Sequence, residues 1–369
     1  MIMKKLTSYC SLNMGQSPDS KTYNTNGEGM PFYQGNADFG VIHPVTRVWC
    51  SQPVKKAKKG DILISVRAPI GAMNIANEDC CIGRGLAALT PFAETSTEFL
   101  YYAVQSRVDS LIAQGTGSTF KAISKKVLEE TLLPSFSKKE QVDIIRKLGL
   151  VDSAIAERQK QLDLLKQLVK SRFIEMFIGQ GYPTKTIDEV SLVKGEYGAQ
   201  SASVEYDPSR PRYVRITDIN DDGTLNDDFV SSINPIDDEQ YRLEYGDFMF
   251  ARMGATVGKT YAFIEGNQIF AGYLIRYKLN QEIINPRYLY WYTRLDEYWN
   301  WVKLNQSGAA QPGINAKKYG SLQVPVPPME LQEQFAAFVK QTDKSKFEIQ
   351  KSLEKLETLK KSLMQKYFG

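Results

Sequence analysis

Two stretches of the chain carry apolar residues at the alternating three- and four-residue steps of a helix. They are Lys138–Phe177 and Met329–Phe368, and both lack proline and are rich in Gln, Glu, Lys and Leu. The apolar positions are Ile155, Leu162, Leu165 and Val169 in the first stretch, and Ile349, Leu353, Leu356 and Leu363 in the second. The pattern predicts two long helices, each on the order of 60 Å if wholly helical. Gly149 is the expected point of interruption in the first helix.

A helix of this length with a single apolar stripe cannot bury that stripe alone and needs a partner. Because the chain contains two such stretches, we expect the two helices to pack against each other in antiparallel fashion, between two globular regions. Two unrelated surface helices are the alternative that the pattern leaves open.

The regions that precede the two stretches share one order of elements. Short runs typical of strands occur at 61–66 and 86–89, and again at 273–279. A helical segment is expected after them, at 97–114 in the first region and at 286–303 in the second. Prolines at 134 and 325 then mark the passage to the long helices.

This common order reflects a repeat at the level of residues, with an offset between 180 and 193 positions. Repeated pairs are Gly60-Asp61 and Gly246-Asp247, Lys125-Lys126 and Lys317-Lys318, and Glu140-Gln141 and Glu333-Gln334. Solenoid repeats have periods of about 20 to 50 residues, so the pattern indicates a duplicated domain instead. Duplication implies pseudo-twofold symmetry, which suits a ligand that is itself bipartite.

The predicted fold class is therefore α/β (α+β), with two mixed domains separated by two long antiparallel coiled-coil helices. The expected domain boundaries are 1–137 for the first mixed domain, 138–178 for the first helix, 179–328 for the second mixed domain and 329–369 for the second helix.

The charge balance limits what kind of partner the chain can bind. The 369 residues include 46 basic and 42 acidic side chains, which gives a net charge of +4. Contact with nucleic acid must then come from local patches of basic residues rather than from a global field. The chain has no apolar run long enough for a membrane span and no signal-peptide pattern at its start, so we expect a cytoplasmic location.

The cysteine and histidine content argues against several kinds of catalytic and metal site. Cysteines stand at 10, 50, 80 and 81, and the second half of the chain does not repeat them. Adjacent cysteines do not fit a zinc knuckle or a redox pair, and reduced thiols are expected. His43 is the single histidine, which argues against a Ser-His-Asp triad or a multi-histidine metal site.

Residues 253–260 resemble a phosphate-binding P-loop, but the match fails in two ways. The spacing between Gly254 and Gly258 is one residue short, and a strand-like run follows where a P-loop requires a helix. The first half has Arg67 to Asn74 at the place of Met253 to Thr260, with no Gly-Lys-Thr, and a strand–turn–strand that carries Arg67 and Arg252 fits both halves better. The aspartates at 218–228, which have no counterpart near Asp38, are expected to form a solvated loop rather than a metal site. No catalytic residue and no metal ligand is predicted.

What remains in both halves is a set of polar, aromatic and cationic residues in glycine-rich loops. Arg, Lys, Asn and Gln can read base edges, and Lys, Ser and Thr can hold phosphates. The candidate DNA contacts are Tyr33, Gln34, Asn36, Arg67, Arg84, Ser118, Thr119 and Lys121, and then Tyr213, Arg215, Thr217, Arg252, Lys259 and Gln311.

Several runs, taken in order and present in both halves, resemble the specificity (S) subunit of a type I DNA restriction–modification system. The runs are 60–71, 117–124, 246–252, 258–259, 314–318 and 327–334. The resemblance covers essentially the full length. The first half departs from the family pattern at 134–141, which blurs the boundary at that point.

The resemblance implies two α/β target-recognition domains, each of which reads one half of an asymmetric bipartite DNA sequence. The two long helices would set the nonspecific gap and dock two methyltransferase (M) subunits. It implies a non-catalytic chain, with S-adenosylmethionine, ATP and Mg on the partners, among them restriction/translocase (R) subunits. The specificity subunit of a bifunctional methylating-and-cutting (type IIB-like) system and a coiled-coil scaffold that binds proteins are the alternatives.

Overall fold

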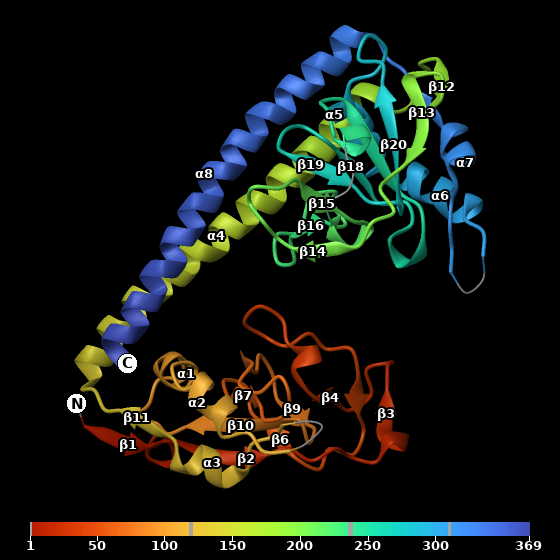
Figure 1. The fold of residues 1–369 in the computed structure, drawn as a ribbon. Helices are drawn as coiled ribbons and strands as arrows, with labels where there is room; N and C mark the ends of the chain where they lie inside the picture. Colours follow the sequence, from red (N-terminus) through yellow and green to blue (C-terminus); the bar gives the residue numbers. More distant parts are fainter. Residues whose placement is uncertain (1, 118–120, 235–238, 309–310) are drawn as a thin grey trace. The chain divides into compact units, whose positions relative to one another are not determined.

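The chain forms two compact units (Figure 1). The computed structural model describes residues 2–117, 121–234, 239–308 and 311–369. The first unit combines residues 1–159 with residues 351–369, and the second unit is residues 160–350. The first unit is therefore built from two separate stretches of chain, and the whole second unit lies between them in the sequence.

Three sheets form the framework of the first unit. An antiparallel four-stranded sheet has the order β2-β10-β7-β8, a five-stranded sheet has the order β3-β5-β4-β9-β6, and β1 pairs with β11. The strands are β1 Met3–Lys5, β2 Cys10–Met14, β3 Tyr23–Asn24, β4 Met30–Tyr33, β5 Trp49–Cys50, β6 Lys56–Ala57, β7 Ile62–Ser65, β8 Met73–Ile75, β9 Cys80–Ile82, β10 Leu86–Pro91 and β11 Leu132–Pro134.

The second unit repeats this plan. Its antiparallel sheet has the order β13-β20-β17-β18, its second sheet has the order β14-β16-β15-β19, and β12 pairs with β21. The strands are β12 Thr184–Thr186, β13 Ser191–Tyr197, β14 Ser203–Glu205, β15 Arg212–Val214, β16 Ser231–Ile233, β17 Asp247–Ala251, β18 Thr260–Ala262, β19 Gln268–Phe270, β20 Leu274–Leu279 and β21 Gln323–Pro325.

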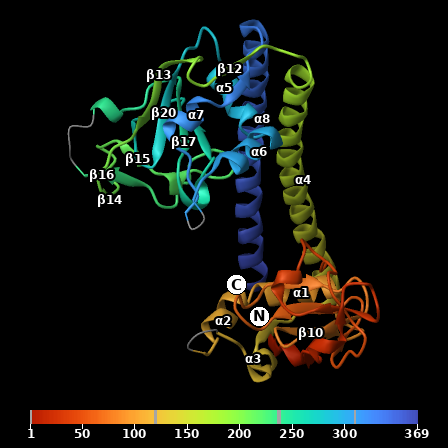
Figure 2. The same ribbon diagram turned by 90° about the vertical axis from the view of Figure 1, so that its right-hand side faces the viewer.

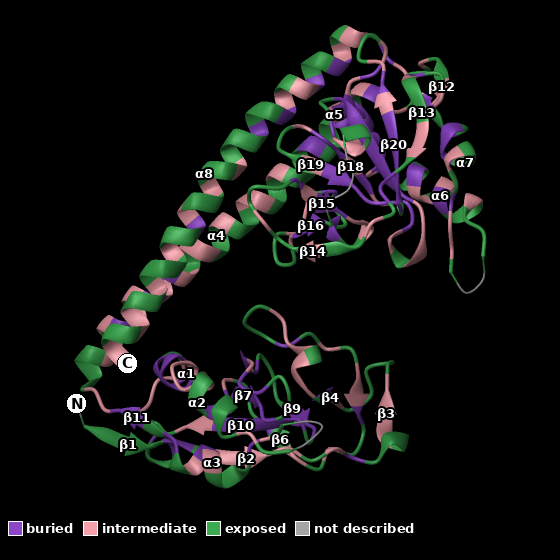
Figure 3. Ribbon diagram, viewed as in Figure 1, coloured by how far each residue is buried: buried purple, intermediate pink, exposed green. Residues whose placement is uncertain are grey.

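The match between the units extends to strand direction. The pairs β4·β9 and β15·β19 are parallel, whereas the other named strand pairs are antiparallel. Figure 3 shows the middle strands β10 and β20 largely in the buried colour, in agreement with their apolar sequences. The duplication predicted from the repeat is confirmed.

Each helical segment predicted within a domain is two helices rather than one. They are α1 Thr97–Gln105 with α2 Val108–Ala113, and α5 Pro286–Tyr292 with α6 Asp296–Asn305. The hydroxyls of Ser106 and Thr293 donate to the carbonyls three residues earlier, over 2.7 and 2.8 Å. Such local bonds compete with the helical ladder at the point where each segment breaks. The units also contain α3 Lys125–Glu130 and α7 Ala316–Gly320.

The two stretches with helical spacing are the helices α4 Lys138–Phe177 and α8 Met329–Phe368, each of 40 residues (Figure 2). Gly149 does not interrupt α4, contrary to the expectation. A glycine costs a helix about 1 kcal/mol relative to alanine. Leu148 and Val151 on either side are buried, and their packing offsets that cost.

The core of the first unit takes residues from both long helices. Ile144 and Leu148 near the start of α4 are buried there together with Phe368 at the end of α8. The ring of Phe368 lies 5.9 Å from that of Phe99 in α1, a separation typical of paired aromatic rings. This core is therefore closed by residues that lie more than 260 positions apart in the sequence.

The core of the second unit takes residues from the opposite ends of the same two helices. Phe173 and Phe177 of α4 pack on Phe335 of α8, with ring centroids 5.2 and 5.6 Å apart. Tyr288 of α5 stacks on Phe173 at 5.3 Å. All four side chains are fully buried or nearly so. Each unit thus buries one end of α4 and one end of α8.

Within the first unit the two helices run in opposite directions. Lys360 of α8 pairs with Asp152 of α4 at 2.7 Å, and Lys147 lies over the ring of Tyr367. Residue numbers rise along α4 as they fall along α8, so this part of the pair is antiparallel. Of the predicted packing residues, Val169 and Leu353 are buried. The partly buried ones are Ile155, Leu162, Leu165, Ile349, Leu356 and Leu363.

Candidate nucleic-acid interface

Each unit has a hollow at the ends of its central strands, and seven of the fourteen predicted DNA-contact residues line these two hollows. The first hollow, of about 200 Å³, is lined by Gln34, Gly35, Asn36, Ser65, Arg67, Ala68, Arg84 and Gly85. The second hollow, of about 420 Å³, is lined by Ala199, Gln200, Ser201, Ser203, Tyr213, Arg215, Ile216, Thr217, Ala271, Gly272 and Tyr273.

The backbone around the two hollows is the same. The N–H of Val66 donates to the carbonyl of Gly85 over 2.9 Å, and the N–H of Arg252 donates to the carbonyl of Tyr273 over 3.0 Å. Val66 is therefore the structural equivalent of Arg252, and Arg67 is the equivalent of Met253. The match of the run from Arg67 with the run from Met253, made from the sequence, is therefore confirmed, and Arg252 has Val66 at its place in the first unit.

A short turn closes each hollow on the other side. In turn 83–86 the last N–H donates to the first carbonyl over 3.0 Å, and in turn 271–274 the same bond measures 2.8 Å. Arg84 is consequently the equivalent of Gly272. The two hollows are one backbone frame that presents different side chains in each unit.

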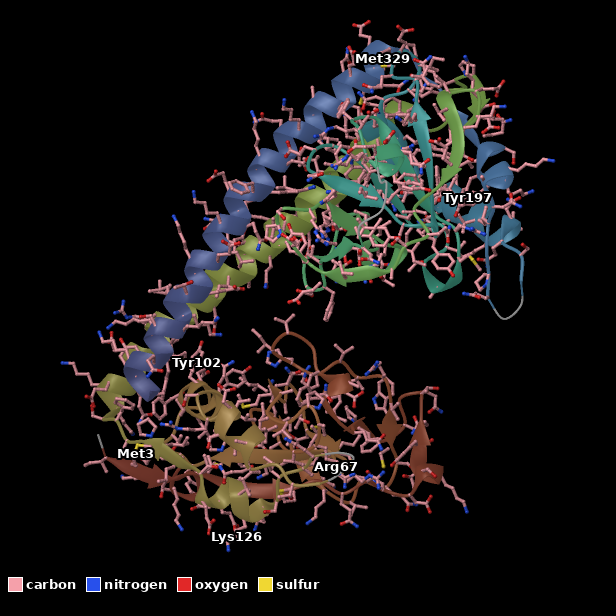
Figure 4. The ribbon with its side chains drawn as sticks, in the orientation of Figure 1. Met3, Arg67, Tyr102, Lys126, Tyr197 and Met329 are labelled. Carbon is pink, nitrogen blue, oxygen red and sulfur yellow. The ribbon has the colours of Figure 1, made fainter. Side chains whose placement is uncertain are left out.

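The first hollow holds two exposed arginines. Arg67 lies just after β7 (Figure 4), and Arg84 lies at the tip of the turn between β9 and β10. Gln34 is exposed and Asn36 is half-buried beside them. The prediction that Tyr33 contacts DNA is wrong. Tyr33 is fully buried at the end of β4, and its hydroxyl is hydrogen-bonded to that of Thr46 over 2.7 Å.

The lining of the second hollow carries no net charge, because its arginine is paired with an aspartate. The guanidinium of Arg215 binds Asp218 through Nε at 3.1 Å and Nη2 at 2.8 Å. Tyr213 is the second correction, because it is buried and its hydroxyl donates to the carbonyl of Ala199 over 2.7 Å. Thr217 is exposed, as its predicted role requires.

Two further residues predicted to contact DNA, Arg252 and Lys259 in the second unit, interact with neighbouring side chains. Arg252 lies over the ring of Tyr197, 4.7 Å from its centroid, and Tyr197 is labelled in Figure 4. Lys259 pairs with Asp221 at 2.7 Å and also donates to the carbonyl of Ile219. The strand β18 begins directly after Lys259, so residues 253–260 do not have the geometry of a P-loop.

One aspartate of the acidic tract in the second unit, Asp218, corresponds to Asp38 in the first unit. Oδ2 of Asp38 accepts the N–H of Gln34 over 2.8 Å, and Oδ2 of Asp218 accepts the N–H of Arg215 over 2.9 Å. An arginine pairs with the other oxygen in each case, Arg47 in the first unit and Arg215 in the second. Asp218 is buried rather than solvated, because these bonds satisfy its charge.

An antiparallel bridge stands beside each hollow. Residues 116 and 122 exchange two backbone bonds of 3.0 and 2.8 Å, and residues 307 and 313 exchange bonds of 3.0 and 2.9 Å. Lys121 and Gln311 lie next to these bridges in the sequence and are exposed. Ser118 and Thr119 lie outside the described residues.

Sequence reasoning missed two residues of the second hollow. Gln200 and Tyr273 line it and are exposed, but neither belongs to a run that marked the candidate contacts. The available signal was Gly272, whose missing side chain leaves room for the amide of Gln200. A Cβ at Gly272 would lie 2.2 Å from Nε2 of Gln200.

A buried aspartate fixes the start of the central strand in each unit. Oδ2 of Asp61 accepts the N–H of Lys58, and Oδ2 of Asp247 accepts the N–H of Glu244, over 2.8 and 3.0 Å. Burial raises the pKa of both carboxyls above the usual value. Arg276 lies 3.5 Å from Asp247 and partly offsets this effect. These two groups serve the framework and line neither hollow.

Within the described ranges, no group of three or more His, Cys, Asp or Glu side chains is placed to hold a metal ion. The four cysteines are free and buried, and burial raises the pKa of Cys10 and Cys80 to about 12. No helix in the described part of the chain has the length and apolar character of a membrane-crossing segment.

Comparison with known proteins gives one consistent result. The family described as "Type I restriction modification DNA specificity domain" matches residues 2–167 and, a second time, residues 181–361. The two matches together cover most of the chain, and each contains one hollow with its framework.

Two relatives come from Methanocaldococcus jannaschii. The putative type I restriction enzyme MjaX specificity subunit is 40% identical over 163 residues, which are 44% of this chain and 38% of the relative. The match therefore spans well under half of that relative's own length. The type I restriction enzyme MjaIX specificity subunit is 19% identical over 402 residues, covering 99% of this chain and 91% of the relative.

One solved structure aligns over the whole chain. It is the type I restriction-modification system S subunit from M. genitalium, with a TM-score of 0.59 and 17% identity, and the alignment covers 100% of this chain and 96% of that one. At this level of identity the likeness shows a shared fold.

Proposed function

Since the chain belongs to the family of type I restriction–modification DNA specificity domains, we propose that it is the DNA-recognition subunit of a type I restriction–modification complex. In this role it selects the site and leaves the chemistry to its partners. S-adenosylmethionine, ATP and Mg would be bound by those partners and not by this chain. The complex would act on DNA in the cytoplasm.

Each unit would read one half of a bipartite DNA target. The observation that carries this proposal is the pair of hollows, which share a backbone frame and differ in side chains. A shared frame suits two surfaces that approach a duplex in the same way. Different side chains suit two half-sites of different sequence.

The helices α4 and α8 would separate the two readers as an antiparallel pair related by approximate twofold symmetry. The support is that each core buries one end of α4 and the opposite end of α8. A rigid spacer makes the second half-site reading intramolecular once the first has occurred, which raises the effective concentration. Half-sites about one helical turn apart, ~34 Å, would present the same face of the duplex to both units.

The same helices would dock two methyltransferase subunits, and restriction/translocase subunits would join through them. Apolar side chains on the outer faces of the helices support this proposal. Val142, Leu150, Leu164, Leu168 and Phe347 are each at least half exposed. A packed partner helix would remove this apolar surface from water.

The test is to change the spacer and map the methylated sites. The chain is expressed with its cognate methyltransferase, with one heptad inserted after Asp163 in α4 and one after Glu348 in α8. Seven residues lengthen a helix by about 10 Å, the rise of roughly 3 base pairs. Sequencing of adenine methylation should then show both half-site sequences unchanged and a gap longer by about that number.

A heptad inserted in α4 alone is the matched control, because it shifts one helix past the other without lengthening both. It should reduce methylation rather than lengthen the gap. New half-site sequences with an unchanged gap in the doubly extended variant would refute the spacer role. Binding of the complex to a duplex with its site should also weaken steeply as salt rises, since phosphate contacts release counterions.

A further inference from the structure

The two hollows differ most at the positions where the first carries arginine. Arg84 stands where the second unit has Gly272, and Arg67 stands where it has Met253. Both arginines line one hollow of about 200 Å³. The frame therefore presents two cations to a ligand in the first unit and none at the same places in the second.

The backbone that carries Arg84 is tightly held. The N–H of Gly83 donates to the carbonyl of Tyr33 over 2.9 Å, which fixes the start of the turn. At Gly85 an added Cβ would lie 2.4 Å from the carbonyl oxygen of Gln34, so only glycine allows the turn to approach this closely. Arg84 is thus an exposed side chain on a fixed base.

The backbone of Arg67 is held from two sides. The hydroxyl of Ser65 donates to the carbonyl of Arg67 over 2.8 Å. The N–H of the next residue, Ala68, donates to the carbonyl of Lys121 over 3.1 Å. Within the described ranges, neither Arg67 nor Arg84 has a hydrogen-bond or ion-pair partner for its guanidinium. The backbone at both arginines therefore needs little ordering when a ligand binds, and the ordering that remains is that of the two side chains.

The chemistry of the first hollow fits the major-groove edge of a base pair. A guanidinium donates two parallel bonds to O6 and N7 of guanine, the commonest base-specific contact in DNA complexes. The amides of Gln34 and Asn36 in the same hollow both donate and accept. A site built for phosphate needs donors alone, whereas a base edge presents donors and acceptors together.

The second hollow lacks a free guanidinium within its described lining. Arg215 is occupied by Asp218 and by the carbonyl of Phe229 at 2.9 Å. The accessible groups are neutral, and Gln200 is the amide among them that lies across Gly272. The two units therefore offer different chemistry to the two halves of a target.

We propose that Arg67 and Arg84 read guanine in the half-site bound by the first unit, and that the second unit reads its half-site without an arginine. The inference rests on the proposed function. It assigns the specificity of the first unit to two named side chains, and it predicts a target that is asymmetric in guanine contacts.

The experiment uses the full chain in complex with its cognate methyltransferase. Methylation mapping of the unmodified complex first gives the two half-sites. The variants R67Q, R84Q and R84K are then mapped in the same way, and Q200A in the second hollow serves as the matched control. Binding is measured on duplexes that carry the mapped site, with each guanine replaced in turn by 7-deazaguanine, which lacks the N7 acceptor.

The expected result has three parts. R67Q or R84Q changes the sequence accepted at a guanine of one half-site, and Q200A changes the other half-site alone. The unmodified complex loses affinity when that guanine is replaced by 7-deazaguanine, and the loss stays below the roughly 5- to 150-fold of a whole bidentate contact because the bond to O6 remains. The R84Q complex binds the unmodified duplex more weakly than the unmodified complex does, and replacing the guanine by 7-deazaguanine does not weaken its binding further. R84K keeps the charge but lacks the planar fork of arginine, so it should restore only part of the affinity that R84Q loses.

Three outcomes would overturn the inference. The first is a half-site without guanine at the position that the variants affect. The second is equal weakening on all duplexes, with a shallower salt dependence and unchanged half-sites, which would assign the arginines to phosphate. The third is unchanged binding and mapping in all the arginine variants. In each of these cases the unmodified complex still methylates a bipartite site, whereas failure of the proposed function itself would leave it with no such site.

Discussion

Tyr102 donates its hydroxyl proton to Oδ2 of Asp152 over 2.8 Å, and Lys360 binds the other oxygen of that carboxylate at 2.7 Å. One carboxylate on α4 therefore connects a short helix of the first unit, α1, with the long helix α8. Burial and the bond to Asp152 raise the pKa of Tyr102, so its hydroxyl stays a donor at physiological pH.

The substitution Tyr102→Phe removes one donor from this connection while keeping the ring. We expect a loss of about 1 kcal/mol in the free energy of unfolding, because Asp152 keeps Lys360 as a partner. Thermal unfolding should show a melting temperature lower by roughly 2–4 °C. Tyr101→Phe is the control, since the Tyr101 hydroxyl has no hydrogen-bond partner within the described residues. Equal effects of the two substitutions would contradict the connection.

The same substitution at two phenylalanines of α8 should have very different effects. Phe335 is fully buried against Phe173 and Phe177, and Phe335→Ala should cost about 3–5 kcal/mol in unfolding free energy. Phe347 is 66% exposed, and Phe347→Ala should stay within about 0.5 kcal/mol of the unmodified chain. Denaturant titration of both variants measures the difference. A large loss for Phe347→Ala in the isolated chain would show that the position is buried in solution.

Replacing the buried carboxyl of Asp61 by an amide should stabilise the protein in a pH-dependent way. Burial raises its pKa above the unfolded value, so ionisation of this group opposes folding. The contribution of the protonated Asp61 carboxyl to the free energy of unfolding is fully present below the pKa of the unfolded state. It is lost as the pH rises through the pKa of the folded state. Asp61→Asn keeps an oxygen to accept the N–H of Lys58 and removes the charge. The melting temperature should rise by roughly 2 °C at pH 7.5, and the difference should vanish near pH 4.

Asp247→Asn is the matched comparison in the second unit. Arg276 lies 3.5 Å from this carboxylate, and the substitution leaves the buried guanidinium with Glu196 as its remaining acidic partner. The gain at pH 7.5 should therefore be smaller than for Asp61→Asn, or reversed in sign. A larger gain for Asp247→Asn would argue against the role given to Arg276.

Gly272→Ala should act on DNA recognition through Gln200. The new Cβ would lie 2.2 Å from Nε2 of Gln200, and this flexible side chain would move away rather than disturb the fold. We expect a methyltransferase complex with Gly272→Ala to bind its duplex as weakly as one with Gln200→Ala, and the double variant to bind no more weakly than either. Gly149→Ala in α4, where an added Cβ meets no atom, should leave binding unchanged and stabilise the helix by about 1 kcal/mol. Additive losses in the double variant would separate the two residues.

The long helices were predictable because their signal is long. Forty residues without proline and with a continuous apolar stripe leave little room for another structure, and α4 and α8 occupy the two stretches. The short helices were predicted at the right places, but their breaks were not. The breaks depend on single hydroxyls, those of Ser106 and Thr293, which bond locally to carbonyls.

The hollows show what sequence comparison within one chain can and cannot predict. The run from Arg67 was matched with the run from Met253, and the backbone bonds of Val66 and Arg252 confirm that register. Tyr33 and Tyr213 were chosen because they stand among glycines and polar residues. Their backbones belong to β4 and β15, however, and these strands direct both rings into the core.

The first unit needs residues 351–369, and these follow the whole second unit in the chain. On the ribosome, the nascent chain therefore presents residues 1–159 long before Phe368 is available to close their core. The second unit, whose residues are contiguous, can finish folding while the first is still open. During translation the second unit can therefore fold before the first, because the core of the first unit is complete only after the last turns of α8 have been synthesised.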